Sequence, residues 1–360
     1  MSKSHFIIPV FVPDLGCPHQ CVFCNQKKIT GHNDVPGADE VTQKIAGYLK
    51  TIPRNPGTTV EVAFYGGSFT AVDPNLQAEL LARAYQFVAS HEIDSIRVST
   101  RPDAVSEDIM ALLSTYGVGT VELGVQSMDD EVLWLSGRGH TSRDVLRASA
   151  LIKEWGVNLG FQIMVGLPGD TEDKEINSAL ELISLRPDLM RIYPCLVLKD
   201  TPLAELYGKG EYVPLTVEQA VWRCKILLLM FERAGVNVIR IGLQPSEQIN
   251  LDGDVLAGPY HPAFRELVET AVIRDQLEYL FKDKAGFESA DMVEVVVPET
   301  DVSWTKGHKG SNVEYFRRKY GISRFVVVPD PGMPRGTIQL ALVDDRKINL
   351  TVNRTDLPVT

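Results

Sequence analysis

The sequence predicts an α/β fold: a parallel sheet with crossover helices, followed by a smaller α+β domain. Over the first 245 residues, short apolar runs alternate with longer amphipathic stretches, and such alternation is typical of parallel sheets. Beyond residue 245 the pattern changes to one long helical stretch and several closely spaced strands. We therefore expect two domains, at residues 1–245 and 246–360, and 360 residues are enough for both.

Seven apolar runs are expected to form the strands of the first domain: 6–12, 60–65, 95–99, 119–125, 157–165, 189–193 and 236–241. Five stretches between them have the spacing of helices: 75–90, 106–116, 141–155, 171–185 and 216–234. The third of these helices follows the same form as the second, in which Ser106 is expected at the N-cap. Six strand–helix units over about 240 residues suit a complete or partial barrel. A doubly wound open sheet would give almost the same pattern, so both remain open on periodicity alone.

The expected second domain has a helix at 262–284 and strands at 292–297, 324–328, 337–343 and 347–352. Its segment 301–324 is locally basic, with six Lys or Arg residues against two acids and several aromatic residues interleaved. Such a mixture occurs on RNA-contacting surfaces. A solvated helix face is the alternative, and it is the commoner origin of a charge run.

Composition excludes several classes of protein. Lys and Arg total 36 against 47 Asp and Glu, which gives a net charge of −11, and 44% of the residues are hydrophobic. An acidic chain attracts DNA or an anionic membrane poorly through its long-range field. No run approaches the roughly 20 apolar residues that span a bilayer, and the apolar N-terminal run is better explained as a strand than as a signal peptide. We expect a cytoplasmic protein without membrane or DNA partners.

Three of the five cysteines lie within eight residues, as Cys17-x3-Cys21-x2-Cys24, directly after the first predicted strand. Three thiolates on one loop can converge on a [4Fe–4S] cluster and leave one iron open to a small chelating ligand. Zinc is the alternative, because it takes four ligands and His19 and His32 are nearby. That alternative describes a non-enzymatic zinc-binding interaction module. A plain electron carrier is disfavoured, since its cluster usually has four cysteine ligands.

The cysteine segment resembles the signature of radical S-adenosylmethionine (SAM) enzymes, with the aromatic Phe23 just before the last cysteine. Further family-like segments follow in order over roughly residues 5–245: 65–70 (YGGSFT), 99–103 (STRPD), 122–127 (ELGVQS), 138–141 (RGHT) and 162–169 (QIMVGLPG). Together they resemble the branch that contains the Elongator catalytic subunit and oxygen-independent coproporphyrinogen oxidase. The resemblance implies a partial (β/α)6 TIM-like barrel.

The resemblance also implies a chemistry: a reduced [4Fe–4S] cluster on Cys17, Cys21 and Cys24 cleaves SAM to a 5′-deoxyadenosyl radical. In similar enzymes particular loops face SAM, which implies a set of contacts for this chain. The implied cofactor-binding residues are Phe23, Gly66, Gly67, Ser68, Gln126, Ser127, Arg138, Gln162, Met164 and Gly166. Arg138 is the candidate for the SAM carboxylate, because a guanidinium can bind a carboxylate at two points. The catalytic groups that act on the substrate are not identified by any motif.

The substrate is expected to be tRNA or a small metabolite, with tRNA favoured by the resemblance, because the Elongator subunit modifies tRNA. A reductant of the flavodoxin or ferredoxin type is implied as a partner. An acetyltransferase domain like that of the Elongator subunit is not expected in this chain. Cys195 follows the sixth strand and could face a substrate, although a lone thiol there is more often a small apolar residue. Cys224 is expected in the core.

Overall fold

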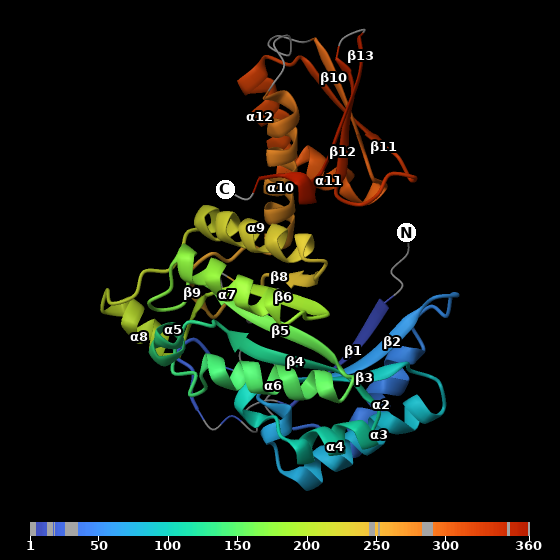
Figure 1. The fold of residues 1–360 in the computed structure, drawn as a ribbon, viewed down its shortest axis with the longest axis vertical. Coiled ribbons are helices and arrows are strands. Elements are labelled where there is room, and N and C mark those ends of the chain that lie inside the picture. Colours follow the sequence, from blue (N-terminus) through green and yellow to red (C-terminus); the bar gives the residue numbers. More distant parts are fainter. Residues whose placement is uncertain are drawn as a thin grey trace. The chain divides into compact units, whose positions relative to one another are not determined.

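The computed structural model describes residues 5–12, 17, 19–25, 35–244, 249–250, 253–282, 291–343 and 346–358. The chain forms two compact units, which are coloured along the sequence in Figure 1. The first consists of Met1–Thr216 and Val236–Pro262, and the second of Val217–Gly235 and Ala263–Thr360. The predicted boundary between residues 245 and 246 lies outside the described residues and stays a prediction. In this division the segment 217–235 belongs to the second unit.

The first unit is built on a seven-stranded parallel sheet in which the strands follow one another in chain order. Its strands are β1 (His5–Phe11), β2 (Thr59–Tyr65), β3 (Ser95–Thr100), β4 (Val118–Gln126), β5 (Asn158–Val165), β6 (Leu189–Pro194) and β8 (Asn237–Ile241). Over the described residues β1 and β8 end the order without pairing with each other, so the sheet is a curled half-barrel. This confirms the predicted partial barrel and removes the doubly wound alternative, whose strand order would reverse.

Helices join successive strands of this sheet. They are α2 (Ala38–Leu49), α3 (Pro74–Ala89), α4 (Glu107–Thr115), α5 (Asp130–Leu135), α6 (Ser142–Glu154), α7 (Glu172–Ser184) and α8 (Pro202–Gly208), with 3₁₀ turns η1 (Phe69–Ala71) and η2 (Pro102–Ala104). Figure 1 shows α3, α4 and α6 along one side of the sheet. The predicted N-cap at Ser106 is confirmed, because its hydroxyl accepts a hydrogen bond from Ile109 N. Helices α2, α5 and α8 were not predicted.

The strands of the half-barrel are apolar because both faces of a parallel sheet are covered. In β2, for example, the consecutive residues Val62, Ala63 and Phe64, which face alternate sides, are all fully buried. A short antiparallel pair, β7 (Val197–Leu198) with β9 (Val255–Ala257), also lies in this unit and was not predicted. Among the described residues, no helix is both long enough and apolar enough to cross a bilayer.

The second unit packs helices against a four-stranded mixed sheet of order β11-β10-β12-β13. Its strands are β10 (Met292–Val297), β11 (Arg324–Pro329), β12 (Thr337–Val343) and β13 (Arg346–Asn353), and its helices are α9 (Val217–Arg233), α10 (Phe264–Phe281), α11 (Val302–Lys306) and α12 (Ser311–Tyr320). Short 3₁₀ turns are η3 (Glu299–Asp301), η4 (His308–Gly310) and η5 (Arg354–Asp356). Phe316, Val295 and Leu340 are fully buried in its core. The predicted α+β character is confirmed.

Candidate functional site

The three clustered cysteines follow β1, at the carboxyl edge of the sheet. Cys17 is exposed, Cys24 is half-buried and Cys21 is buried, and none of these three cysteines forms a disulfide bond. The segment is anchored at Val22, whose N–H donates to Ser136 O at 3.0 Å and whose carbonyl accepts from Leu203 N at 2.8 Å. Within the described residues, no three His, Cys, Asp or Glu side chains lie close enough together to hold a metal ion. The predicted zinc candidate His32 lies outside the described residues.

The loop after α5 contacts the cysteine segment at two glycines, Gly137 and Gly139. Gly137 and Gly139 have φ angles of 63° and 72°, a region that side chains other than glycine rarely adopt. A Cβ on Gly139 would lie 2.3 Å from Cδ2 of His19, and one on Gly137 would lie 3.0 Å from the carbonyl of Gln20. The positive φ favours glycine at both positions, and at Gly137 the backbone of Gln20 also leaves little room for a Cβ.

Arg138, between these glycines, connects β4 to the cysteines. Its Nη1 donates to Cys21 Sγ at 3.2 Å and its Nη2 donates to the carbonyl of Gly124. Arg101, at the end of β3, donates to the carbonyl of Arg138 and pairs with Asp103 at 2.9 Å. Both guanidinium groups are buried. The structure thus places two cations and one carboxylate beside the thiols.

The positive charges of Arg101 and Arg138 beside the cysteines favour an anionic ligand. Arg101 Nη1 and Arg138 Nε are buried and have no hydrogen-bond partner among the described residues, nor has His140 Nδ1. Burial, with the nearby Arg138 and Arg101 charges, lowers the pKa of His140 to about 3, so this ring is neutral. Orphaned donors beside three thiols fit a thiolate-ligated cluster and a carboxylate-bearing ligand.

A β-bulge near the end of β4 sets the orientation of Gln126. The pairing of β4 with β5 shifts register between Gly124 and Gln126, and Gln126 has a φ of 72°. Its Oε1 accepts a hydrogen bond from Gln162 Nε2 at 3.4 Å, so these two predicted SAM contacts are brought together. Ser127, the next predicted contact, is buried, and its hydroxyl accepts from Asp129 N at 3.1 Å.

The loop after β2 holds the predicted residues Gly66, Gly67 and Ser68. The two glycines have φ angles of 90° and 54°, so their conformation requires glycine. Ser68 is fully buried, and its hydroxyl is hydrogen-bonded to Thr100 Oγ1 at 2.8 Å and to Arg101 N at 3.2 Å. The Ser68 side chain therefore ties this loop to the end of β3.

The end of β5 carries the last predicted contacts. Met164 and Phe23 both pack, half-buried, against the apolar cluster around Leu167. Gly166 has a φ of 80°, and a Cβ there would lie 2.7 Å from Leu215 Cδ1. Its N–H donates to Glu175 Oε1 at 2.8 Å and its carbonyl accepts from the Tyr212 hydroxyl at 2.7 Å.

A buried charge network crosses the sheet. Arg97 of β3 bonds Glu61 of β2 and, at 2.6 Å, Glu122 of β4, and Glu122 also pairs with Arg191 of β6. Arg191 donates to the Tyr65 hydroxyl at 2.7 Å. Burial alone would raise the pKa of Glu122, yet Arg191 and Arg97 hold it below its ordinary value. The sequence signal for this network is a charged residue inside each of three successive apolar strands, with opposite signs on neighbouring strands: Glu61, Arg97 and Glu122.

The two remaining cysteines are core residues. Cys195 is buried beside Val197 and Leu203, and burial raises the pKa of its thiol to about 12. Cys224 is fully buried on α9, as predicted. The apolar interpretation of Cys195 therefore fits its surroundings better than a reactive thiol does.

Comparison with known proteins assigns the fold and these motifs to one family. The Radical SAM superfamily matches residues 12–183, and the Radical_SAM C-terminal domain matches residues 187–274, together more than half of the chain. In Methanocaldococcus jannaschii, a tRNA uridine(34) acetyltransferase is 29% identical over 253 residues, which are 60% of this chain and 47% of that protein. Human Elongator complex protein 3 is 27% identical over 173 residues, 42% of this chain and 32% of that protein.

A solved structure supports the fold. The archaeal Methanocaldococcus infernus Elp3 with an N-terminal deletion aligns with a TM-score of 0.62 at 23% sequence identity. The alignment covers 77% of this chain and 64% of that one. The chain spans about half the length of the first curated relative, so the likeness concerns the shared region and not the whole of that protein. The predicted resemblance is confirmed: this chain belongs to the radical SAM superfamily, where its relatives include Elongator complex protein 3.

Proposed function

We propose that this chain is an enzyme that binds one [4Fe–4S] cluster through Cys17, Cys21 and Cys24 and uses it to cleave SAM reductively. The observation that carries the proposal is the contact of Arg138 with Cys21 at 3.2 Å, within the region that matches the radical SAM superfamily. When bound, the cluster and SAM supply one-electron chemistry that ends in a 5′-deoxyadenosyl radical, which the protein positions.

The chain's own residues have five tasks in this proposal. Arg138 and Arg101 place positive charge beside the thiolates, and their unpartnered donors are available to the carboxylate of SAM. Gln126, held by Gln162, presents an amide to a ribose hydroxyl. Gly66 and Gly67 let the backbone approach the SAM amino group. Phe23, Met164 and Gly166, the remaining proposed contacts, lie at the apolar cluster around Leu167 and exclude water from the site. Ser68 and Ser127 hold their loops in place through hydrogen bonds of their hydroxyls.

For the substrate we propose tRNA, with a flavodoxin- or ferredoxin-type protein as reductant. The support is that several relatives bear the name tRNA uridine(34) acetyltransferase. Acetyl transfer itself is not part of the proposal. A small metabolite is the other substrate class.

The test is anaerobic reconstitution with iron and sulfide, followed by reduction, addition of SAM and chromatography for 5′-deoxyadenosine. We expect about four irons per chain and 5′-deoxyadenosine from the wild type. A triple variant, Cys17→Ala with Cys21→Ala and Cys24→Ala, should yield neither, while the matched control Cys224→Ala should retain both. A colourless protein that binds about one zinc and does not bind SAM would replace the proposal with the zinc-binding interaction module.

A further inference from the structure

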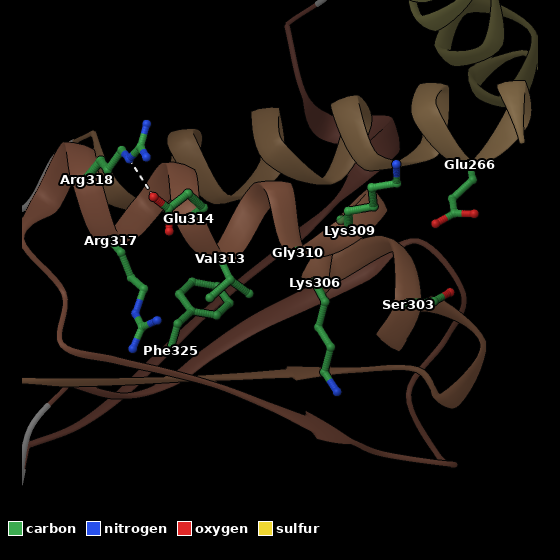
Figure 2. A pocket seen from close by; sticks show the side chains of 11 residues that line it. Glu266, Ser303, Lys306, Lys309, Gly310, Val313, Glu314, Arg317, Arg318 and Phe325 are labelled. Carbon is green, nitrogen blue, oxygen red and sulfur yellow. Dashed lines mark ion pairs between the residues drawn. The ribbon is translucent and has the colours of Figure 1, made fainter. Parts of the chain in front are cut away.

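A broad groove of about 800 Å³ lies in the second unit, between α10, α11, α12 and β11. Its lining includes four basic residues, Lys306, Lys309, Arg317 and Arg318, and two acids, Glu266 and Glu314. Figure 2 shows Lys306 and Arg317 extending to the same side, with Val313 and Phe325 between them. The groove is therefore positive on a chain whose net charge is −11.

One of the two acids that line this groove is paired with an arginine, whereas three of the cations have no acidic partner among the described residues. Glu314 pairs with Arg318 at 2.5 Å, and Glu266 lies 3.4 Å from Nδ1 of His308. Within the described part of the chain, Lys306, Lys309 and Arg317 form no ion pair. Three basic side chains are thus left to attract an anion.

Arg317 is also fixed in direction. Its Nε and Nη2 both donate to the carbonyl of Ser323, at 3.3 and 2.7 Å. A carbonyl holds the guanidinium without neutralising it, so less side-chain entropy remains to be lost when an anion binds. By contrast Lys319, two residues further along α12, is held by both oxygens of Glu278 at 2.9 and 2.8 Å. The structure thus divides the basic segment into available and neutralised charges.

The aromatic residues of the same segment are used for packing. Trp304 lies under the Arg335 guanidinium, Tyr315 packs beside Arg274, and Tyr320 stacks on Phe316. Phe325 is the aromatic residue among those that line the groove. Proteins that bind single-stranded nucleic acid need several exposed rings on which bases stack. The groove has cations and few such rings, which suits contacts with phosphates rather than with bases.

We infer that this groove binds the sugar–phosphate backbone of a folded RNA, with Lys306 and Arg317, which extend to the same side in Figure 2, as the phosphate contacts. The inference rests on the proposed function for its choice of RNA over other polyanions. It assigns substrate binding to the second unit, apart from the cysteines and the predicted SAM contacts. Because phosphate contacts carry no sequence information, the groove would position an RNA without selecting its sequence.

The experiment compares the wild type with a double variant that carries both Lys306→Gln and Arg317→Gln. A labelled tRNA transcript is titrated by fluorescence anisotropy at several KCl concentrations. Loss of two phosphate contacts should weaken binding roughly tenfold or more and reduce the slope of log Kd against log salt by about 2. The control is Lys50→Gln with Lys153→Gln, which makes the same change in charge at exposed positions that precede β2 and β5. The control should bind as the wild type does.

Three further readings make the result decisive. Thermal unfolding of both double variants should match the wild type, and SAM cleavage without RNA should be unchanged in both. If the wild type cleaves SAM while groove and control variants bind tRNA equally, the inference fails and the proposed function stands. If the groove variant alone loses tRNA while no protein cleaves SAM, the proposed function fails and the groove stands. If poly-glutamate displaces tRNA as well as unlabelled tRNA does at equal charge, the assignment to RNA is overturned.

Discussion

Arg138 donates a hydrogen bond to the Cys21 thiol at 3.2 Å while its other Nη donates to the carbonyl of Gly124 at the end of β4. One guanidinium therefore sets the distance between the cysteine segment and the strand that carries Gln126. These two parts of the site are separated by about a hundred residues in sequence, and a buried charged group joins them.

Replacing Arg138 with Gln should impair the site more than the fold. The variant loses a charge-assisted contact of about 1.5–3 kcal/mol, which corresponds to a roughly 10- to 100-fold effect. We expect iron content after reconstitution, or SAM affinity, to fall by at least about tenfold. The matched control is Arg143→Gln, an exposed arginine on α6, which should behave as the wild type. Equal iron content and equal SAM affinity in both variants would contradict the role given to Arg138.

Gly139→Ala should displace the exposed His19 ring and, through the strained backbone at residue 139, disturb the adjoining cysteine segment. The new Cβ would lie 2.3 Å from the His19 ring, and the φ of 72° is unfavourable for alanine. We expect reduced iron content after reconstitution. We also expect Cys21, which is buried in the wild type, to react faster with a thiol reagent in the variant. Gly47→Ala is the control, since nothing lies within 4 Å of a Cβ there and the residue is in the middle of α2. The control should be as stable as the wild type or more stable by about 0.5–1 kcal/mol. If both variants bind the same amount of iron, the close approach of the loop after α5 to the cysteine segment is not needed for cluster binding.

Glu122→Gln should strongly destabilise the first unit. The change leaves Arg97 and Arg191 buried without their shared carboxylate, a situation that costs about 3–5 kcal/mol. Urea unfolding should show this loss. Adding Arg191→Met to Glu122→Gln should restore part of it, because Arg97 keeps its pair with Glu61 and the charge left uncompensated is that of Arg191. A double variant that is no more stable than Glu122→Gln alone would mean that the charge balance of the network is not what stabilises the sheet.

Stability should fall in acid through Glu61. Burial raises the pKa of this carboxyl, but hydrogen bonds from His5 and the Arg97 charge prevail and lower it to about 2. A lowered pKa in the folded state stabilises the protein at pH above the unfolded value of 4.5, and this contribution is lost as the pH falls toward 2. The contribution is about 3 kcal/mol. Unfolding free energy measured from pH 5 to pH 2 should therefore fall less steeply in Glu61→Gln than in the wild type; parallel curves would refute the assignment.

Much of the fold could be predicted because its signals are local. The alternation of apolar strands with amphipathic helices predicted the parallel sheet, and Ser106 was recognisable as a helix cap. The partial barrel was implied by the family resemblance and not by the periodicity. Helix α5 was missed, since six residues are too few for a periodic pattern. Strands β7 and β9 were missed because their pairing joins residues about sixty positions apart.

The candidate site divides in the same way. The sequence by itself determined the three thiols, their spacing and the glycines of the loops, because these depend on residue type and on neighbours along the chain. Only the tertiary structure decided that Arg138 contacts Cys21, that the Ser68 hydroxyl is engaged with Thr100, and that Glu61, Arg97, Glu122 and Arg191 form one network. A buried polar group needs partners, and folding supplies them from strands that are distant in sequence.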